Sequence, residues 1–214
     1  MKNEHLYNVA GLLRSPSEFL SRVEDGGGAV GPILFLSALS AAGAAIFGFA
    51  LGSFAGPETG LLDALKMAGV ILFAYALTYP SLYVFASICG WRHSAMRLAT
   101  FGLVSTGVLG CLLAALAPIL WIFAVSTETL AFIMLFSVLL AGVALVIAFR
   151  PVARVADTGP DSANAGFAIW FVLFTIVALQ TVTLWRPLLS SADAPEASKE
   201  KRFFLQHFVE EFQR

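Results

Sequence analysis

Tyrosines and hydroxyl side chains gather around a proline inside one strongly apolar stretch of the chain, AYALTYPSLY. These groups can bond the carbonyl that proline leaves unpaired, or cross-link neighbouring helices, but none of them titrates near neutral pH. They therefore predict a focus of the fold that is either helix packing or a pocket for a ligand or lipid. This focus comprises Tyr75, Thr78, Tyr79, Pro80, Tyr83 and, from a later apolar stretch, Gln180, and a pocket would add Thr100, Ser105, Thr106, Thr181 and Thr183.

Cys89 and His93 are four residues apart and can share one face of a helix. A zinc site needs further ligands, and neither His5 nor His207 is an obvious one. The sequence also lacks the motifs of zinc proteases, hydrolases and nucleotide-binding loops. We predict no catalytic residue, metal or cofactor, and so no enzyme. A membrane enzyme using His93 and Arg92 at the interface is the remaining alternative.

The composition explains where these residues must lie. Of 214 residues, 58% are hydrophobic and 13% are charged, and the mean hydropathy is +0.83, whereas soluble domains carry about a quarter charged residues. A water-soluble fold of this size cannot hide so much apolar surface. The formal net charge of −1 gives no reason to expect nucleic acid as a partner.

Five apolar segments reach the roughly 20 residues that a transmembrane helix needs. They predict an all-α, polytopic helical bundle in contact with the lipid bilayer. Their interiors hold no charged residue or histidine, which argues against ion-coupled transport. Prolines inside the second and third segments predict static kinks rather than a gating hinge. The predicted spans are Ala29–Ala55, Met67–Cys89, Met96–Val125, Leu130–Phe149 and Ala165–Trp185.

Basic residues in the connecting segments predict the orientation, because the cytoplasmic side carries more of them. The internal segments hold Arg92, Arg97, Arg150 and Arg154 on the side of the N-terminus and Lys66 on the other. We expect a cytoplasmic N-terminus and an outside C-terminus. The polar, acidic start of the chain does not resemble a cleavable signal, so the first span is expected to act as an anchor.

Both ends of the chain predict helices that lie on the membrane surface. In the N-terminal interfacial segment, 1–28, the sequence SPSE at 15–18 has the pattern of a helix start, and a second amphipathic turn is expected within 5–13. After the transmembrane domain, 29–185, comes a polar linker, 186–198. An amphipathic helix, 199–214, would then dock on the membrane, on the protein's own bundle or on a partner through Phe204, Leu205, Phe208, Val209 and Phe212.

Small residues recur at every fourth position of the first span. Such a stripe allows close helix packing, which is the main source of helix association in a bilayer. It does not distinguish packing within one chain from assembly of several copies. The predicted packing face is Ser40, Ala44, Gly48, Gly52 and Gly56.

Three sequence features, RSPSEF near the N-terminus, GGGAVGP before the first span and TYPSLY in the second, together resemble the YIP family over about residues 8–185. The resemblance implies a five-span domain with a cytosolic N-terminus and a membrane-organising or adaptor role. Members of that family interact with Rab-type GTPases. A long cytosolic N-terminal region is missing here, which favours a bacterial inner-membrane protein. The resemblance implies structural roles for Pro16, Phe19, Tyr79, Pro80 and Tyr83.

Two function hypotheses follow. The first is a non-enzymatic membrane scaffold or accessory subunit that binds a protein partner or forms a homo-oligomer through its first span and C-terminal helix. The second is a small channel or carrier for a neutral solute or lipid, motivated by the hydroxyl groups of the second, third and fifth spans.

Overall fold

The computed structural model describes residues 9–14, 30–90, 94–156 and 163–184, and these form helices and short turns without a strand. Five of the helices are long and apolar enough to cross a membrane, so the prediction of an all-α bundle with five spans is confirmed. In chain order the helices are α1 (Val9–Arg14), α3 (Val30–Gly52), α4 (Pro57–Ile88), α5 (Ala95–Ser126), α6 (Leu130–Ala156) and α7 (Ala163–Leu184).

The second spanning helix begins earlier than expected. Helix α4 starts at Pro57, at the first helical position where proline is favoured, and not near Met67. The added turns bring Asp63 and Lys66 into the helix, before the predicted span Met67–Cys89, whose interior holds no charged side chain. The apolar run alone placed the start too late, because these two charges interrupt it.

Helices α4 and α5 each contain 32 residues, which corresponds to about 48 Å and exceeds a bilayer core of about 30 Å. Each helix continues through its internal proline, Pro80 in α4 and Pro118 in α5. Both prolines are exposed on the outside of the bundle. The excess length must therefore be taken up by tilt or by turns that extend beyond the hydrocarbon.

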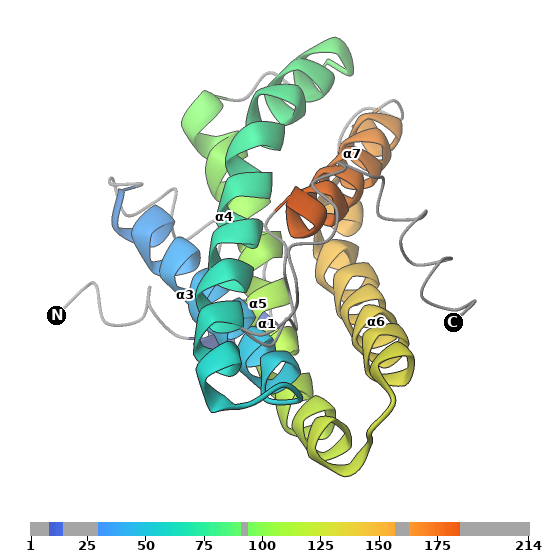
Figure 1. Cartoon of the computed structure of the whole chain (residues 1–214). Helices are drawn as coiled ribbons and strands as arrows, with labels where there is room; N and C mark the ends of the chain where they lie inside the picture. Colours follow the sequence, from blue (N-terminus) through green and yellow to red (C-terminus); the bar gives the residue numbers. More distant parts are fainter. Residues whose placement is uncertain (1–8, 15–29, 91–93, 157–162, 185–214) are drawn as a thin grey trace, which may run out of the picture.

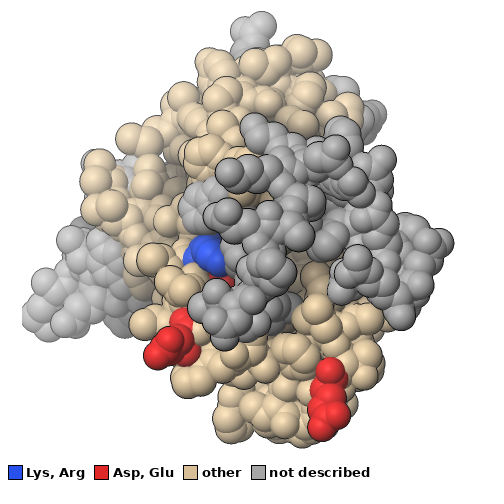
Figure 2. All heavy atoms as spheres, viewed as in Figure 1, with Lys and Arg blue, Asp and Glu red and all other residues tan. Residues whose placement is uncertain are grey.

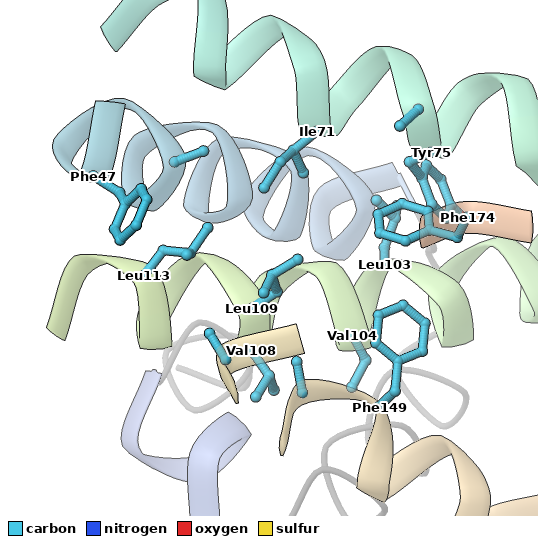
Figure 3. Packing of buried hydrophobic residues seen from close by; sticks show 14 of the residues in the cluster. Phe47, Ile71, Tyr75, Leu103, Val104, Val108, Leu109, Leu113, Phe149 and Phe174 are labelled. Carbon is cyan, nitrogen blue, oxygen red and sulfur yellow. The ribbon is translucent and has the colours of Figure 1, made fainter. Parts of the chain in front are cut away.

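Helix α3 lies between α4 and α5 and packs extensively against both (Figures 1 and 3). Helix α7 packs on α4 and α6 packs on α5, while α6 and α7 touch each other less. Figure 3 shows Phe47 of α3 beside Leu113 of α5, with Ile71 of α4 also facing this interior. The core is therefore centred on α3 and the middle of α5.

Large apolar side chains cover the outside of the described helices. Leu65 of α4, Ile122 of α5 and Leu139 of α6 are among many that are more than half exposed. Figure 2 shows only a few charged residues on the described part of one face. Such a surface suits contact with lipid tails and is unsuited to water.

Candidate functional site

Two tyrosines of α4 fasten this helix to the first half of α5. The Tyr75 hydroxyl donates to the Ala99 carbonyl at 2.6 Å, and the Tyr79 hydroxyl donates to the Ala95 carbonyl at 2.8 Å. Tyr75 and Tyr79 are four residues apart on α4, as Ala95 and Ala99 are on α5, so the two bonds form successive rungs between the helices. Neither tyrosine bonds the carbonyl of Ala76, which Pro80 leaves without its usual helical partner.

A glycine makes room for the first of these tyrosines. A β-carbon at Gly102 of α5 would lie 2.8 Å from the Tyr75 ring and 3.1 Å from Leu82. A β-carbon at these distances would require the Tyr75 ring to shift, so Gly102 lets this ring lie close to the backbone of α5. The aromatic ring and the glycine thus form one contact.

Trp170 of α7 supplies the third inter-helix bond. Its indole N–H donates to the Thr78 carbonyl of α4 at 3.0 Å, and the side chain is fully buried. The Thr78 hydroxyl turns back to the Ala74 carbonyl of its own helix at 2.8 Å. Phe149 of α6 and Phe174 of α7 pack at the Trp170 ring, with ring centroids 5.4 and 5.9 Å away.

We call Tyr75, Thr78, Tyr79 and Trp170 the hydrogen-bonded seam, because three of their four side chains donate between helices. Sequence reasoning missed Trp170. The available signal was that a tryptophan within a span needs either the interface or a partner for its N–H.

The other members of the predicted focus lie elsewhere. Pro80, Tyr83 and Gln180 are exposed on the outer surface, and Tyr83 keeps 43% of its area accessible. They do not share an enclosed space with Tyr75 and Thr78. The focus is therefore smaller than the sequence suggested.

Most hydroxyls of the third and fifth predicted spans bond within their own helices. Thr100 donates to the Met96 carbonyl, and Thr181 donates to the Val177 carbonyl. Thr106 and Thr183 do the same. The exception is Ser105 of α5, whose buried hydroxyl has no hydrogen-bond partner among the described residues.

The small residues of α3 pack inside this chain, on two sides of the helix. On one side Gly43 meets the backbone of Gly110 in α5 so closely that a β-carbon would overlap its carbonyl, and Ser40 lies at the same contact. On the other side Gly48 and Gly52 meet α4. Gly60 of α4 in turn lies close to Phe49 of α3. The glycine seam is Gly43, Gly48, Gly52, Gly60 and Gly110.

Four of the five residues of the predicted packing face lie in α3 and are buried, and the fifth lies outside this helix. Ser40, Ala44, Gly48 and Gly52 are all buried. Gly56 is not on the packing face, because α3 ends at Gly52 and Gly56 precedes α4 with a φ of 122°. A positive φ of this kind favours glycine, so Gly56 serves the turn. Gly43 and Gly110 were missed because they fall outside the four-residue repeat.

A charge pair lies at the edge of the glycine seam. Asp63 of α4 is completely buried, and a β-carbon at Gly52 would lie 3.0 Å from its side chain. The Lys66 side chain is a quarter exposed, and its ammonium donates to the Asp63 carboxylate at 3.3 Å. Because Gly52 is the last residue of α3, the pair lies near the level where that helix ends. Asp63 is the buried ionisable group that sequence reasoning missed.

The remaining predicted groups are the two cysteines, His93 and the residues of the tail, and only the cysteines lie in the described part of the chain. There, no three His, Cys, Asp or Glu side chains come together as a metal site. Cys89 and Cys111 are half-buried thiols, and Cys89 lies against Gly166 of α7. His93 and the tail residues Phe204, Leu205, Phe208, Val209 and Phe212 lie outside the described residues. Taken together, the described polar groups can hold helices at fixed positions.

Comparison with known protein families, curated proteins and solved structures finds no match to this chain.

Proposed function

We propose that the chain is a non-enzymatic membrane scaffold or accessory subunit. One observation carries the proposal. In the hydrogen-bonded seam, the side chains of Tyr75, Tyr79 and Trp170 donate hydrogen bonds to backbone carbonyls of neighbouring helices. In a bilayer such bonds hold helices together. A rigid platform of this kind supports an assembly role similar to that of YIP-family membrane-organising proteins.

The packing of α3 bears on where the proposed partner would bind. The glycine seam of α3 is filled by α4 and α5 of the same chain, so a partner there would have to displace them. We therefore place the proposed contact at the C-terminal segment, 199–214, whose sequence offers an apolar stripe.

Gentle-detergent purification followed by mass measurement tests this proposal. The full chain should self-assemble or hold a protein partner at fixed stoichiometry, and Phe208→Glu should abolish that association. Gln206→Glu is the matched control, because it adds the same charge two residues away on the polar side of the segment, and it should keep the association. A monomer without partner in all three proteins would contradict the proposal.

A carrier for a neutral solute is the second candidate, and Ser105 is the observation that favours it. A buried hydroxyl without a partner is uncommon, and a passing polar solute would satisfy it. Flux through liposomes containing the protein should then fall in the Ser105→Ala variant. No flux above empty liposomes across a panel of neutral solutes would rule this candidate out.

We further propose a bacterial inner-membrane location with the N-terminus in the cytoplasm, on the basis of the basic residues of the internal segments. Reporter fusions test the orientation. A phosphatase fused after Arg214 should be active and a fluorescent protein fused there should be dark, and the opposite pair of results would reverse the topology.

A further inference from the structure

Helix α7 has one face in the bundle and one face outside it. It packs on α4 and touches α6 less (Figure 1), and its inner residues Trp170, Phe174 and Thr181 are buried. The outer face carries exposed apolar side chains and, near its end, a half-exposed threonine. We call these residues the outer seam, and they follow one another at alternating intervals of three and four: Ile169, Val172, Ile176, Leu179 and Thr183.

The spacing of the outer seam is that of one helix in a left-handed pair, a common arrangement of membrane helices. Isoleucine occupies one of the two repeating positions, at 169 and 176, while valine and leucine occupy the other, at 172 and 179. In parallel coiled coils, β-branched residues at the first position and leucine at the second favour two strands. Copies of one chain enter the membrane in the same orientation, so a two-fold axis along the membrane normal makes their α7 helices parallel.

An amide lies on the same face, where lipid tails cannot bond it. Gln180 is exposed, and its side chain makes no hydrogen bond among the described residues. It precedes Leu184 by four positions, which is about 6 Å along the helix. The span itself has 19 residues and a length of about 28 Å, which hardly covers a bilayer core of about 30 Å. We therefore expect Gln180 to lie in the hydrocarbon, where a polar group needs a partner from another helix.

Thr175 supplies such a partner on the opposite flank of the outer seam. Its hydroxyl donates to the Phe171 carbonyl of its own helix at 2.8 Å, and the oxygen can still accept a hydrogen bond. Thr175 and Gln180 are five residues apart. In a parallel pair, a flanking residue of one helix meets the residue five positions further on in the other. The same chain thus carries donor and acceptor at complementary positions, which selects a second copy as the occupant of this face.

We propose that two copies of the chain pair through the outer seam of α7, with the Gln180 amide of each copy donating to the Thr175 hydroxyl of the other. The two-fold axis makes two such bonds in each pair. This α7 pair goes beyond the proposed scaffold function, because it does not involve the segment 199–214. Phe208→Glu should therefore leave the pair intact, so failure of either proposal is seen separately.

Cysteine crosslinking of the purified full chain in liposomes tests the pair. With Cys89→Ala and Cys111→Ala removing the native thiols, Val172→Cys is compared with Val146→Cys on α6. The two valines each keep 54% of their area accessible, so random collisions in the membrane reach both equally. With an added oxidant and excess lipid, Val172→Cys should form a disulfide-linked dimer about tenfold faster, because pairing holds the two thiols close together. Equal rates, as expected if lipid or a different protein covers α7, would overturn the proposal.

Removal of the two bonds tests their chemistry. Energy transfer between labelled copies, followed as the protein is diluted with lipid, measures the dissociation constant of the pair. Gln180→Leu and Thr175→Val should each raise it about fivefold to tenfold, since either change deletes both bonds. The double variant should raise it no further.

Thr181→Val is the matched control for these variants. It deletes a buried hydroxyl that bonds within α7, to the Val177 carbonyl, and it should leave the dissociation constant unchanged. An unchanged constant in Gln180→Leu, or additive increases in the double variant, would overturn the proposal.

Discussion

The glycine seam and the hydrogen-bonded seam hold the same bundle together by different means. In the glycine seam, backbone meets backbone, and the contacts at Gly43 and Gly52 leave no space for a β-carbon. In the hydrogen-bonded seam, long side chains from α4 and α7 reach carbonyls that already belong to helices. Loss of a donor there leaves no carbonyl unpaired, whereas an added atom in the glycine seam must push two helices apart.

This difference separates geometry from chemistry. The glycine seam fixes how close α3, α4 and α5 lie, so its effects should depend on side-chain volume. The hydrogen-bonded seam fixes rotation and register, so its effects should depend on single donors. The two seams therefore predict mutational effects of different size and different chemical origin.

The largest effect should come from volume in the glycine seam. Gly43→Leu should prevent the bundle from forming, because even a β-carbon would overlap the Gly110 carbonyl. Gly142→Leu adds the same side chain where nothing lies within 4 Å, and it should fold. The amount of monodisperse protein on gel filtration measures both. Normal recovery of Gly43→Leu would show that the close contact is not required.

Removal of the buried carboxylate should have the next largest effect and tests whether this seam is purely steric. Asp63→Ala deletes the carboxylate that Lys66 contacts and should cost about 1–2 kcal/mol, since the Lys66 side chain is a quarter exposed and can turn toward water. Glu58→Ala, at an exposed position in the same helix, should change stability by less than about 0.5 kcal/mol. Reversible unfolding in mixed micelles gives both values. Equal losses of unfolding free energy in the two variants would mean that Asp63 stabilises the bundle only through the volume of its side chain.

In the hydrogen-bonded seam, loss of the indole donor should cost less. Trp170→Phe keeps an aromatic ring beside Phe149 and Phe174 but removes the bond to the Thr78 carbonyl. We expect a loss of about 1 kcal/mol, measured by the same unfolding assay. Phe171→Leu, which changes a partly buried ring of the same helix without a hydrogen bond, is the comparison. A loss above about 3 kcal/mol would give the ring itself the main role.

The smallest effect should come from the tyrosine nearest the end of the seam. Tyr79→Phe removes the bond to the Ala95 carbonyl, which lies at an exposed site, and should cost about 0.6 kcal/mol or less. Tyr83→Phe, on the outer surface of the same helix, should be neutral. A larger loss of unfolding free energy in Tyr79→Phe than in Trp170→Phe would reverse the order of the two hydrogen bonds that we expect.

The sequence predicted the spans well because twenty consecutive apolar residues have few alternatives. It predicted Tyr75, Thr78 and Tyr79 as a focus because polar groups inside a span need partners. It did not separate them from Tyr83 and Gln180, since facing inward or outward depends on how α4 and α7 are rotated in the bundle. The buried position of Asp63 was hidden for a related reason: its side chain lies at the contact with Gly52 of α3, and that contact depends on how the helices pack.

The contact between Gly43 and Gly110 also could not be predicted from the sequence. These glycines lie on two helices that α4 separates in the sequence, and no periodicity in either helix marks their contact. The four-residue repeat instead selected Gly56, which the structure places in a turn. Small-residue patterns thus indicated that α3 packs closely, and the three-dimensional arrangement determined where.

The difference between the two seams is tested most directly by comparing them in one lipid environment. The free energy of unfolding in bicelles is measured for Gly43→Ala and for the combined variant Tyr75→Phe, Tyr79→Phe and Trp170→Phe. The added methyl group of Gly43→Ala should cost about 3 kcal/mol or more, while loss of all three donors should cost about 2 kcal/mol. A tolerated Gly43→Ala beside an unfolded triple variant would contradict the account.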